Sequence, residues 1–125
     1  MVSIDPQSSL AEARKVVGQR RFRHVPVVTP GGRICGIVSD RDLFALVSRD
    51  DAQEVLEAKV VADIMTRRVL TATADTNIRE IARVLFEERI GCMPIVNQED
   101  QVIGIITRSD ILRALIKHAP LDLWI

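Results

Sequence analysis

Two short runs in the sequence combine residue types that together could hold a sugar phosphate. They are Gly36-Ile-Val-Ser39-Asp-Arg-Asp42 and Gly104-Ile-Ile-Thr107-Arg-Ser-Asp110, and each joins an apolar stretch to a helical pattern. Free N–H groups at a helix start, a hydroxyl and an arginine suit a phosphate. A carboxylate three residues after the hydroxyl can accept hydrogen bonds from the vicinal hydroxyls of a ribose.

The same residues also have a purely structural interpretation. Ser39 and Thr107 are residue types that cap helices, and an acid three residues later completes a capping box and complements the helix dipole. A single copy would favour capping alone. Two copies at equivalent positions shift the interpretation toward ligand binding, and the glycine that opens each run lets a ligand approach the backbone closely.

Both runs belong to a longer internal repeat. When the chain is shifted by 68 residues, the segment from Ser9 to Val47 aligns without a gap with residues 77–115. Eight of the 39 aligned pairs are identical, and apolar residues face apolar residues at Leu10/Ile78 and Val17/Leu85. A repeat of this length indicates a duplicated small domain rather than a solenoid.

Each copy predicts the same elements in the same order. A helix over residues 9–21, or its counterpart beginning at Asn77, starts with an N-cap type and has Glu three residues later. Two apolar strands joined by a short turn then predict a hairpin, and a second helix closes the copy. The strands are Val25–Val28 and Ile34–Val38, then Met93–Val96 and Val102–Ile106; the closing helices are Asp40–Ser48 and Arg108–His118. Between the copies we expect short helical pieces at Ala52–Ala58 and Val61–Met65, and a strand at Val69–Thr73.

Composition excludes several classes of function. The 17 basic residues are balanced by 17 acidic ones, which argues against a dedicated nucleic-acid binder, and only 3% of the residues are aromatic. No signal peptide begins the sequence and no apolar run is long enough to span a bilayer, so we expect a cytoplasmic protein without direct membrane insertion. The two cysteines are far apart and only two histidines are present, so we expect no metal site. The sequence also offers no combination of nucleophile, base and orienting group, so we do not expect an enzyme.

At this point the chain resembles a tandem pair of CBS (cystathionine-β-synthase-type) domains, together called a Bateman module. The matching residues are the VADIMT segment (61–66), the strand starts His24-Val-Pro-Val-Val28 and Cys92-Met-Pro-Ile-Val96, and both Gly-to-Asp runs. The resemblance implies an α/β (α+β) fold of two β-α-β-β-α units, related by a pseudo-two-fold axis, with the sheets packed together and helices outside. It divides the chain into a first motif (1–50), a linker (51–60), a second motif (61–118) and an apolar tail (119–125).

The resemblance also implies two clefts that hold adenosyl ligands such as AMP, ADP, ATP or S-adenosylmethionine. Carried over residue by residue, the first cleft takes Ser39, Arg41, Asp42, Ala62, Met65, Thr66, Gly91, Cys92 and Met93. The second takes Ser3, Ile4, Arg23, His24, Thr107, Arg108 and Asp110. His24 has two possible roles, as a structural residue or in ligand binding. Cys92 and Met93 likewise either line the cleft or belong to the core.

One segment breaks the symmetry of the repeat. Residues 60–68 precede the second copy, but the sequence has no counterpart before the first, because Met1 aligns with Val69. We therefore expect the cleft that contains Asp42 to be the better nucleotide site, since its VADIMT wall is present in the chain. The second cleft has in its favour the larger cationic set of Arg23, His24 and Arg108.

Two functions remain open on the sequence. The first is a regulatory module that senses an adenine nucleotide and acts on a partner or on an attached enzyme or transporter domain. The second is a structural homodimerisation module whose clefts no longer bind. In either case we expect a homodimer through the helices beside the clefts, and the apolar tail suggests burial against a partner or against the chain's own surface.

Overall fold

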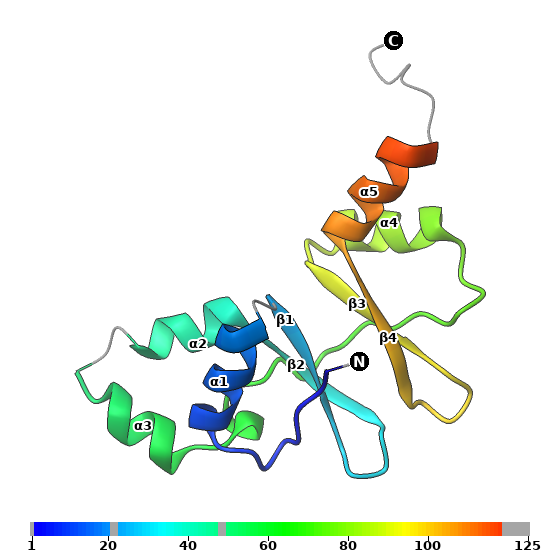
Figure 1. The fold of residues 1–125 in the computed structure, drawn as a ribbon. Helices are drawn as coiled ribbons and strands as arrows, with labels where there is room; N and C mark the ends of the chain where they lie inside the picture. The colour runs from blue at the N-terminus through cyan, green and yellow to red at the C-terminus, as the bar shows by residue number, and fades with distance from the viewer. Residues whose placement is uncertain (1, 21–22, 48–49, 119–125) are drawn as a thin grey trace.

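Each half of the chain folds into a hairpin of two strands flanked by helices. The computed structural model describes residues 2–20, 23–47 and 50–118, so the apolar tail lies outside the described residues. The order is α1 (Leu10–Arg20), β1 (His24–Val28), β2 (Ile34–Ser39), α2 (Asp40–Val47), α3 (Ala52–Ala58), a 3-10 turn (Val61–Asp63), α4 (Ile78–Glu87), β3 (Cys92–Val96), β4 (Val102–Thr107) and α5 (Arg108–His118). Figure 1 shows α1, α2 and α3 around the first hairpin and α4 and α5 beside the second.

The two hairpins repeat each other in backbone detail. Pro26 lies opposite Ile37 in the first antiparallel pair, and Pro94 lies opposite Ile105 in the second, 68 residues later in both strands. The register shifts at equivalent places, between Val27 and Val28 and between Ile95 and Val96. The sequence repeat is therefore a structural repeat, and the expected α/β fold of two related units is confirmed.

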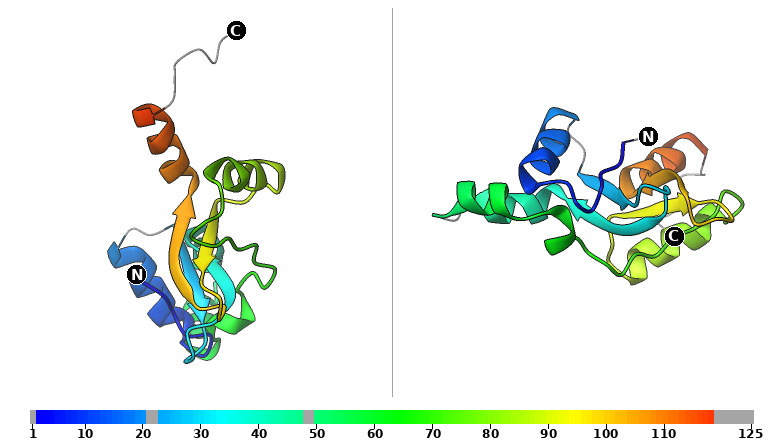
Figure 2. Two further views of the ribbon diagram at one scale, coloured as in Figure 1. Left: turned by 90° about the vertical axis from the view of Figure 1, so that its right-hand side faces the viewer. Right: turned by 90° about the horizontal axis from the view of Figure 1, so that it is seen from below.

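The hairpin turns bind the two units together through a reciprocal pair of backbone hydrogen bonds. Val102 N donates to Gly32 O over 3.1 Å, and Ile34 N donates to Asp100 O over 3.4 Å. Gln101 adds a side-chain bond from Nε2 to Gly31 O over 3.2 Å. Figure 2 shows the hairpins meeting in the middle of the molecule, with α2 and α3 toward one end and α4 and α5 toward the other.

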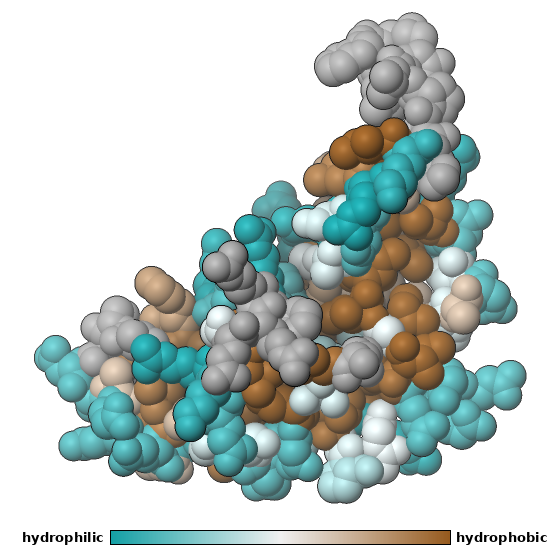
Figure 3. All heavy atoms as spheres, in the orientation of Figure 1, coloured by the Kyte–Doolittle hydropathy of each residue, from teal (hydrophilic) through white to brown (hydrophobic). Residues whose placement is uncertain are grey.

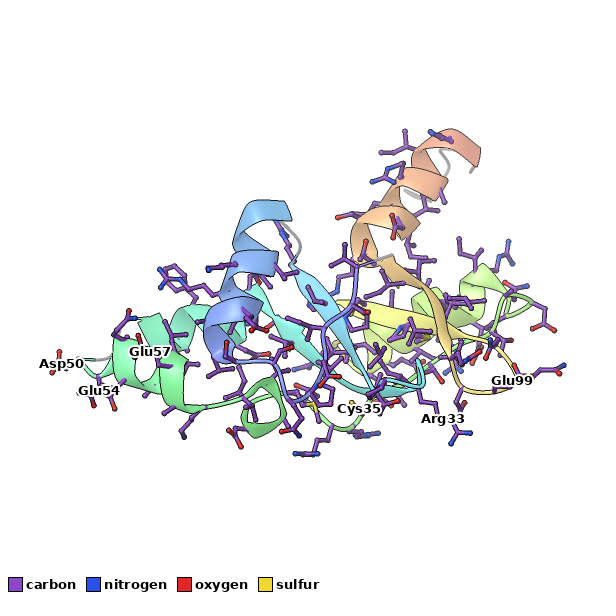
Figure 4. The ribbon with its side chains drawn as sticks, turned by 60° about the horizontal axis from the view of Figure 1, so that its bottom comes forward. Arg33, Cys35, Asp50, Glu54, Glu57 and Glu99 are labelled. Carbon is purple, nitrogen blue, oxygen red and sulfur yellow. The ribbon has the colours of Figure 1, made fainter. Side chains whose placement is uncertain are left out.

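The two turns differ in sequence but share one backbone requirement. Gly32 and Asp100 are aligned by the 68-residue shift, and both have positive φ, at 85° and 61°. Left-handed backbone costs little for Gly, and Asp tolerates it better than most side chains. Figure 4 shows Arg33 and Glu99, which sit beside these positions, together at this end of the molecule, far from the exposed Asp50, Glu54 and Glu57.

The apolar core is larger in the first unit than in the second. Leu10, Val25, Val27, Val38 and Val61 are fully or almost fully buried there. Val55 and Leu56 of α3 belong to the same core, and α3 packs against both α1 and α2. The second core centres on a smaller set, Ala72, Ile81, Leu85 and Met93. Figure 3 shows the result, an apolar surface along α5 and on the strands next to it.

Most predicted helix starts are present, with one difference in capping. Ser9 Oγ accepts from Glu12 N over 3.1 Å, and Asn77 Oδ1 accepts from Arg79 N over 2.8 Å, so both N-caps are confirmed. The Glu80 carboxylate, however, binds Arg83 on the helix surface rather than returning to Asn77. An exposed charge partner three residues along the helix competes successfully with the cap.

The strand predicted at Val69–Thr73 is wrong. Only Ala72 pairs there, donating to Pro94 O over 3.0 Å and accepting from Val96 N over 2.8 Å. Ile4 makes the equivalent isolated bridge to Val27 in the first unit. A single residue of contact with β3 is enough to bury Ala72, while Val69 and Leu70 are turned toward the space between the units.

The segment that links the units completes the outer edge of β2. Thr66 and Ile37 exchange backbone hydrogen bonds of 2.9 and 3.0 Å, and the buried Met65 lies against Gly36. A Cβ at Gly36 would lie 2.5 Å from Met65 Sδ and 3.0 Å from Thr66 O. The equivalent Gly104 of β4 has open space, since its first contact would be Ile95 Cβ at 4.0 Å.

The two glycines therefore make a matched pair for mutation. We expect Gly36→Ala to destabilise the fold by about 1–3 kcal/mol, because Met65 and the Thr66 backbone must move to admit the methyl group. We expect Gly104→Ala to be neutral or slightly stabilising, because glycine in a strand interior weakens it and no atom obstructs the new Cβ. Urea unfolding of both variants measures the difference; equal losses at the two positions would contradict the asymmetry.

Candidate functional site

A cleft of about 1020 Å³ opens between the two units, and its size suits a small-molecule ligand. Its walls come from the start of β1, the junction of β2 with α2, the linking segment, the approach to β3 and the start of α5. The lining residues are Arg23, His24, Ile37, Ser39, Asp40, Arg41, Asp42, Phe44, Ala45, Thr66, Arg68, Val69, Leu70, Glu88, Arg89, Ile90, Gly91, Cys92 and Arg108.

The capping box at the start of α2 faces this cleft. Ser39 N donates to Asp42 Oδ2 over 3.0 Å, and Asp42 N donates to Ser39 Oγ over 3.0 Å. These bonds use one carboxylate oxygen; the second oxygen, Oδ1, has no hydrogen-bond partner among the described residues. The half-buried Asp42 is thus fixed in orientation by the fold while keeping an acceptor for a ligand.

The capping box at the start of α5 has the same geometry in a different place. Thr107 N donates to Asp110 Oδ2 over 2.8 Å, and Asp110 N donates to Thr107 Oγ1 over 3.3 Å. Neither Thr107 nor Asp110 lines the cleft. The capping interpretation is therefore confirmed for both runs. In the described residues the first run also lines the cleft, whereas Thr107 and Asp110 do not.

Positive charge exceeds negative charge around the cleft. Five arginines line it, at positions 23, 41, 68, 89 and 108, against Asp40, Asp42 and Glu88. Arg68 and Glu88 form an exposed pair at 3.8 Å, and Arg108 Nε donates to Ile90 O over 3.1 Å, which holds its guanidinium group at the cleft. An anionic ligand meets a favourable field here.

His24 forms a close contact between the two units. Its ring lies over Gly91, because a Cβ at Gly91 would be 2.7 Å from His24 Cε1 and 2.8 Å from Nε2. Burial is the main influence on the imidazole and lowers its pKa below 6.5; Asp40 and Asp42 raise it, while Arg108 and Arg23 lower it further. His24 is therefore mostly neutral at pH 7, under the opposed influence of two carboxylates and two guanidinium groups.

The structure brings together six of the nine residues predicted for the first cleft, namely Ser39, Arg41, Asp42, Thr66, Gly91 and Cys92. The other three are Ala62, Met65 and Met93, none of which lines the cleft. Met65 and Met93 are buried in the two cores, and Ala62 packs beside the first core with its carbonyl bound to Arg67.

The residues predicted for the second cleft separate into two groups. Arg23, His24 and Arg108 line the same cleft as Ser39 and Asp42. Ile4 is buried and paired to Val27, and Ser3 is exposed beside it. The larger cationic set that favoured a second cleft is thus available to the first.

Several lining residues were not identified from the sequence as candidates. They are Ile37, Asp40, Phe44, Ala45, Val69, Leu70, Glu88, Arg89 and Ile90. A usable signal existed for Arg89, because the 68-residue shift aligns it with an identical residue, Arg21, just before the first hairpin. Arg89 also has a positive φ of 55°, which turns the chain from α4 into the cleft wall.

The two cysteines are poor nucleophiles in this fold. Burial raises the pKa of the Cys92 thiol to about 11. Burial also raises the pKa of Cys35, whose Sγ lies 3.4 Å from Val27 O, although Arg67 opposes the change. Across residues 2–20, 23–47 and 50–118, no three His, Cys, Asp or Glu side chains gather as metal ligands. In the same ranges, no helix combines the length and apolarity needed to cross a bilayer.

Comparison with known proteins agrees with the architecture. A sequence profile described as "CBS domain" matches residues 1–49 and 61–117. The curated relatives include the chloroplastic CBS domain-containing protein CBSX2 of Arabidopsis thaliana, 27% identical over 91% of this chain and 58% of its own length. They also include inosine-5'-monophosphate dehydrogenase of Methanocaldococcus jannaschii, 30% identical over 90% of this chain and 21% of its own length. This chain therefore spans between about a fifth and three fifths of these two relatives.

Solved structures give the same result at the level of the fold. A crystal structure of CBSX2 in complex with AMP has a TM-score of 0.81 and 30% identity, covering 94% of this chain and 88% of that one. The CBS domain pair of protein MJ0100, in complex with 5'-methylthioadenosine and S-adenosyl-L-methionine, has a TM-score of 0.76 and 30% identity, covering 90% and 91%. With both halves matched in sequence and the duplicated fold present, the chain belongs to the CBS domain family.

Proposed function

We propose that this chain is a regulatory module that binds an adenine nucleotide in the cleft between its two CBS units. The observation that supports it most strongly is Asp42, a carboxylate oriented by its own helix cap at the wall of a cleft lined by five arginines. In this proposal the free Asp42 oxygen accepts from the ribose hydroxyls, and arginines at the cleft take the phosphate. Related CBS pairs in complexes with AMP and with S-adenosyl-L-methionine support an adenosyl ligand.

The charge of the cleft favours a phosphate-bearing ligand over S-adenosylmethionine. Five arginines against three carboxylates leave a positive excess, and Arg41 and Arg108 sit on opposite units. A ligand that contacts both units would shift the equilibrium between two arrangements of the pair, and an attached domain or a partner protein would register that shift. This role is binding and regulation, without a chemical step, and we place it in the cytoplasm.

We propose in addition that the module forms a homodimer through the helices beside the cleft. Phe44 of α2 and Phe86 of α4 are 76% and 84% exposed, and Ile116 of α5 is 81% exposed. Phe44 also lines the cleft. Large apolar side chains exposed on the helices of both units are typical of an association surface, and a second copy would cover them.

The first prediction compares the two capping aspartates. Asp42→Asn and Asp110→Asn each weaken a helix cap and should lose similar stability, about 0.5–2 kcal/mol. Only Asp42→Asn should also weaken nucleotide binding, by roughly ten- to a hundredfold, since it removes a charged acceptor from the cleft. Thermal unfolding and calorimetric titration with AMP, ADP, ATP and S-adenosylmethionine measure both effects.

Ligand at 100 times its dissociation constant should stabilise the wild-type chain by about 2.7 kcal/mol. Absence of any shift with all four ligands would reject nucleotide sensing and leave a structural pairing module. Loss of binding in Asp110→Asn with binding intact in Asp42→Asn would instead place the site on the other unit.

The second prediction concerns pH. A bound phosphate near His24 should raise the lowered pKa of this histidine, so binding takes up a proton and tightens as pH falls from 7.5 toward 6. The ligand phosphate also titrates in this range, so the measurement is the difference between wild type and His24→Gln. His118→Gln, at the far end of α5, is the control and should behave as wild type. A His24→Gln profile identical to wild type would remove His24 from the site.

The third prediction tests the dimer. Light scattering at tens of micromolar should give twice the mass of the 14.0 kDa chain. Phe86→Glu should shift the protein to monomer, because it places a charge in a buried apolar contact. Glu99→Lys, a change at an exposed position of the hairpin turn, should leave the dimer intact. A monomeric wild-type chain would contradict the proposal.

A further inference from the structure

Arg89 occupies a backbone position at the end of α4 that usually belongs to glycine. Ile90 N donates to Leu85 O over 3.1 Å, and Arg89 N donates to Phe86 O over 3.4 Å. This pair of bonds is the common helix ending in which the residue after the cap is left-handed, and Arg89 has the matching φ of 55°. A side chain in this conformation is strained, because its Cβ crowds the backbone. Such strain is frequent where a side chain serves a function.

The Arg89 side chain lies between two hollows of the surface. It lines the cleft between the units, and it also lines a second hollow of about 590 Å³ at the end of α4 and the start of α5. The second hollow is lined by Leu85, Phe86, Glu87, Arg89 and Arg108. Arg89 and Arg108 are the two residues that the hollows share, so two guanidinium groups mark the passage from one to the other.

The acidic side chains nearby are already paired, whereas the shared cations are available. Arg83 Nη1 binds Glu87 Oε2 at 2.8 Å on the surface of α4, and Arg68 pairs with Glu88 at 3.8 Å. The guanidinium group of Arg89 has no hydrogen-bond or ion-pair partner among the described residues. An unpaired guanidinium beside a second one suits the oxygens of a phosphate, which accept several charge-assisted hydrogen bonds.

The shared arginines lie on the side of the cleft toward which a phosphate chain would grow. In the proposed binding mode the ribose sits at Asp42. The pKa of His24 is raised by Asp42 and lowered by Arg108, so both groups act on the same imidazole from opposite units. A first phosphate would therefore lie within electrostatic reach of Arg108. Each further phosphate would extend the chain across Arg108 toward Arg89 and the second hollow.

We propose that Arg89 and Arg108 form a subsite for the terminal phosphates of a nucleoside di- or triphosphate, which makes the module selective for ADP and ATP over AMP. This inference rests on the proposed function, because it extends the same cleft. Arg89 is then the specificity-determining residue, and an arginine is kept at a glycine position because its side chain binds the ligand.

The test is Arg89→Gly, which relieves the backbone strain and removes the cation together. Its Tm should rise by about 2–5 °C, because glycine adopts positive φ without strain. Calorimetric titration of the full chain should show that wild type binds ADP and ATP at least about tenfold more tightly than AMP. Arg89→Gly should lose roughly tenfold in affinity for ADP and ATP, while the affinity for AMP changes by less than about twofold. A purely structural role cannot make the protein more stable and less selective at once.

Two further variants are controls. Arg33→Ala removes one positive charge at an exposed position of the hairpin turn and should leave all three affinities unchanged. Arg89→Lys keeps the charge without the planar guanidinium and should retain part of the preference for ADP and ATP.

Several results would overturn the subsite while leaving the proposed function in place. One is a wild-type chain that binds ADP and ATP no more tightly than AMP. Another is an Arg89→Gly variant that weakens all three nucleotides equally, which would place Arg89 at the first phosphate. A third is a lowered Tm in Arg89→Gly with unchanged selectivity, which would assign Arg89 to the fold. If none of the three nucleotides binds the wild-type chain, the subsite and the proposed function are rejected together.

Discussion

The outer edge of each hairpin's second strand must find hydrogen-bond partners, and much of the architecture follows from how this is done. At the turn end, β2 and β4 satisfy each other through the reciprocal bonds of Gly32 with Val102 and of Asp100 with Ile34. Farther along, the linking segment satisfies β2 at Ile37. Because Thr66 is fixed by that pairing, the chain must continue through Arg68 and Leu70 along the wall of the cleft. The pairing thereby helps to shape the cleft as well as to hold the units together.

The cleft in turn depends on the closeness of the two hairpins. His24 lies against Gly91 with no room for a side chain, so β1 and β3 begin side by side. This contact brings the start of α5, with Arg108, to the same space as the start of α2, with Asp42. Neither unit alone has both a free, oriented carboxylate and this group of arginines. A ligand that contacts both is sensitive to the relative position of the units, which is what a regulatory module requires.

The hairpins, the flanking helices and the duplication could be predicted from the sequence, because each rests on local signals. Short β-branched runs separated by turn residues indicate hairpins, and Ser39 with Asp42 marks a helix start by chemistry within four residues. The prediction of a strand at Val69–Thr73 was wrong because a strand also needs a partner that is distant in the sequence. Its residues have high strand propensity, but only Ala72 meets another backbone, and propensity carries no information about whether a partner is present.

Which residues share a cleft could not be predicted from the sequence. Arg23 and Arg108 were assigned by analogy to one cleft and Asp42 to another, whereas all three line one space. The reason is that β1 and β3 begin next to each other, so that side chains at the start of either strand reach the same cleft. This closeness is a property of how the hairpins pack, and it has no signature in spacing along the chain.

The reciprocal bonds between Ser39 and Asp42 bear on the speed of ligand capture. In many binding sites the side chain that contacts the ligand samples several rotamers and becomes ordered only when the ligand binds, which costs conformational entropy. Here the carboxylate was ordered when the helix formed, whether or not a ligand is present. If a nucleotide binds at this wall as proposed, its association would be governed by diffusion and by attraction to the surrounding arginines rather than by a slow rearrangement of Asp42. The occupancy of the cleft would then follow changes in ligand concentration promptly.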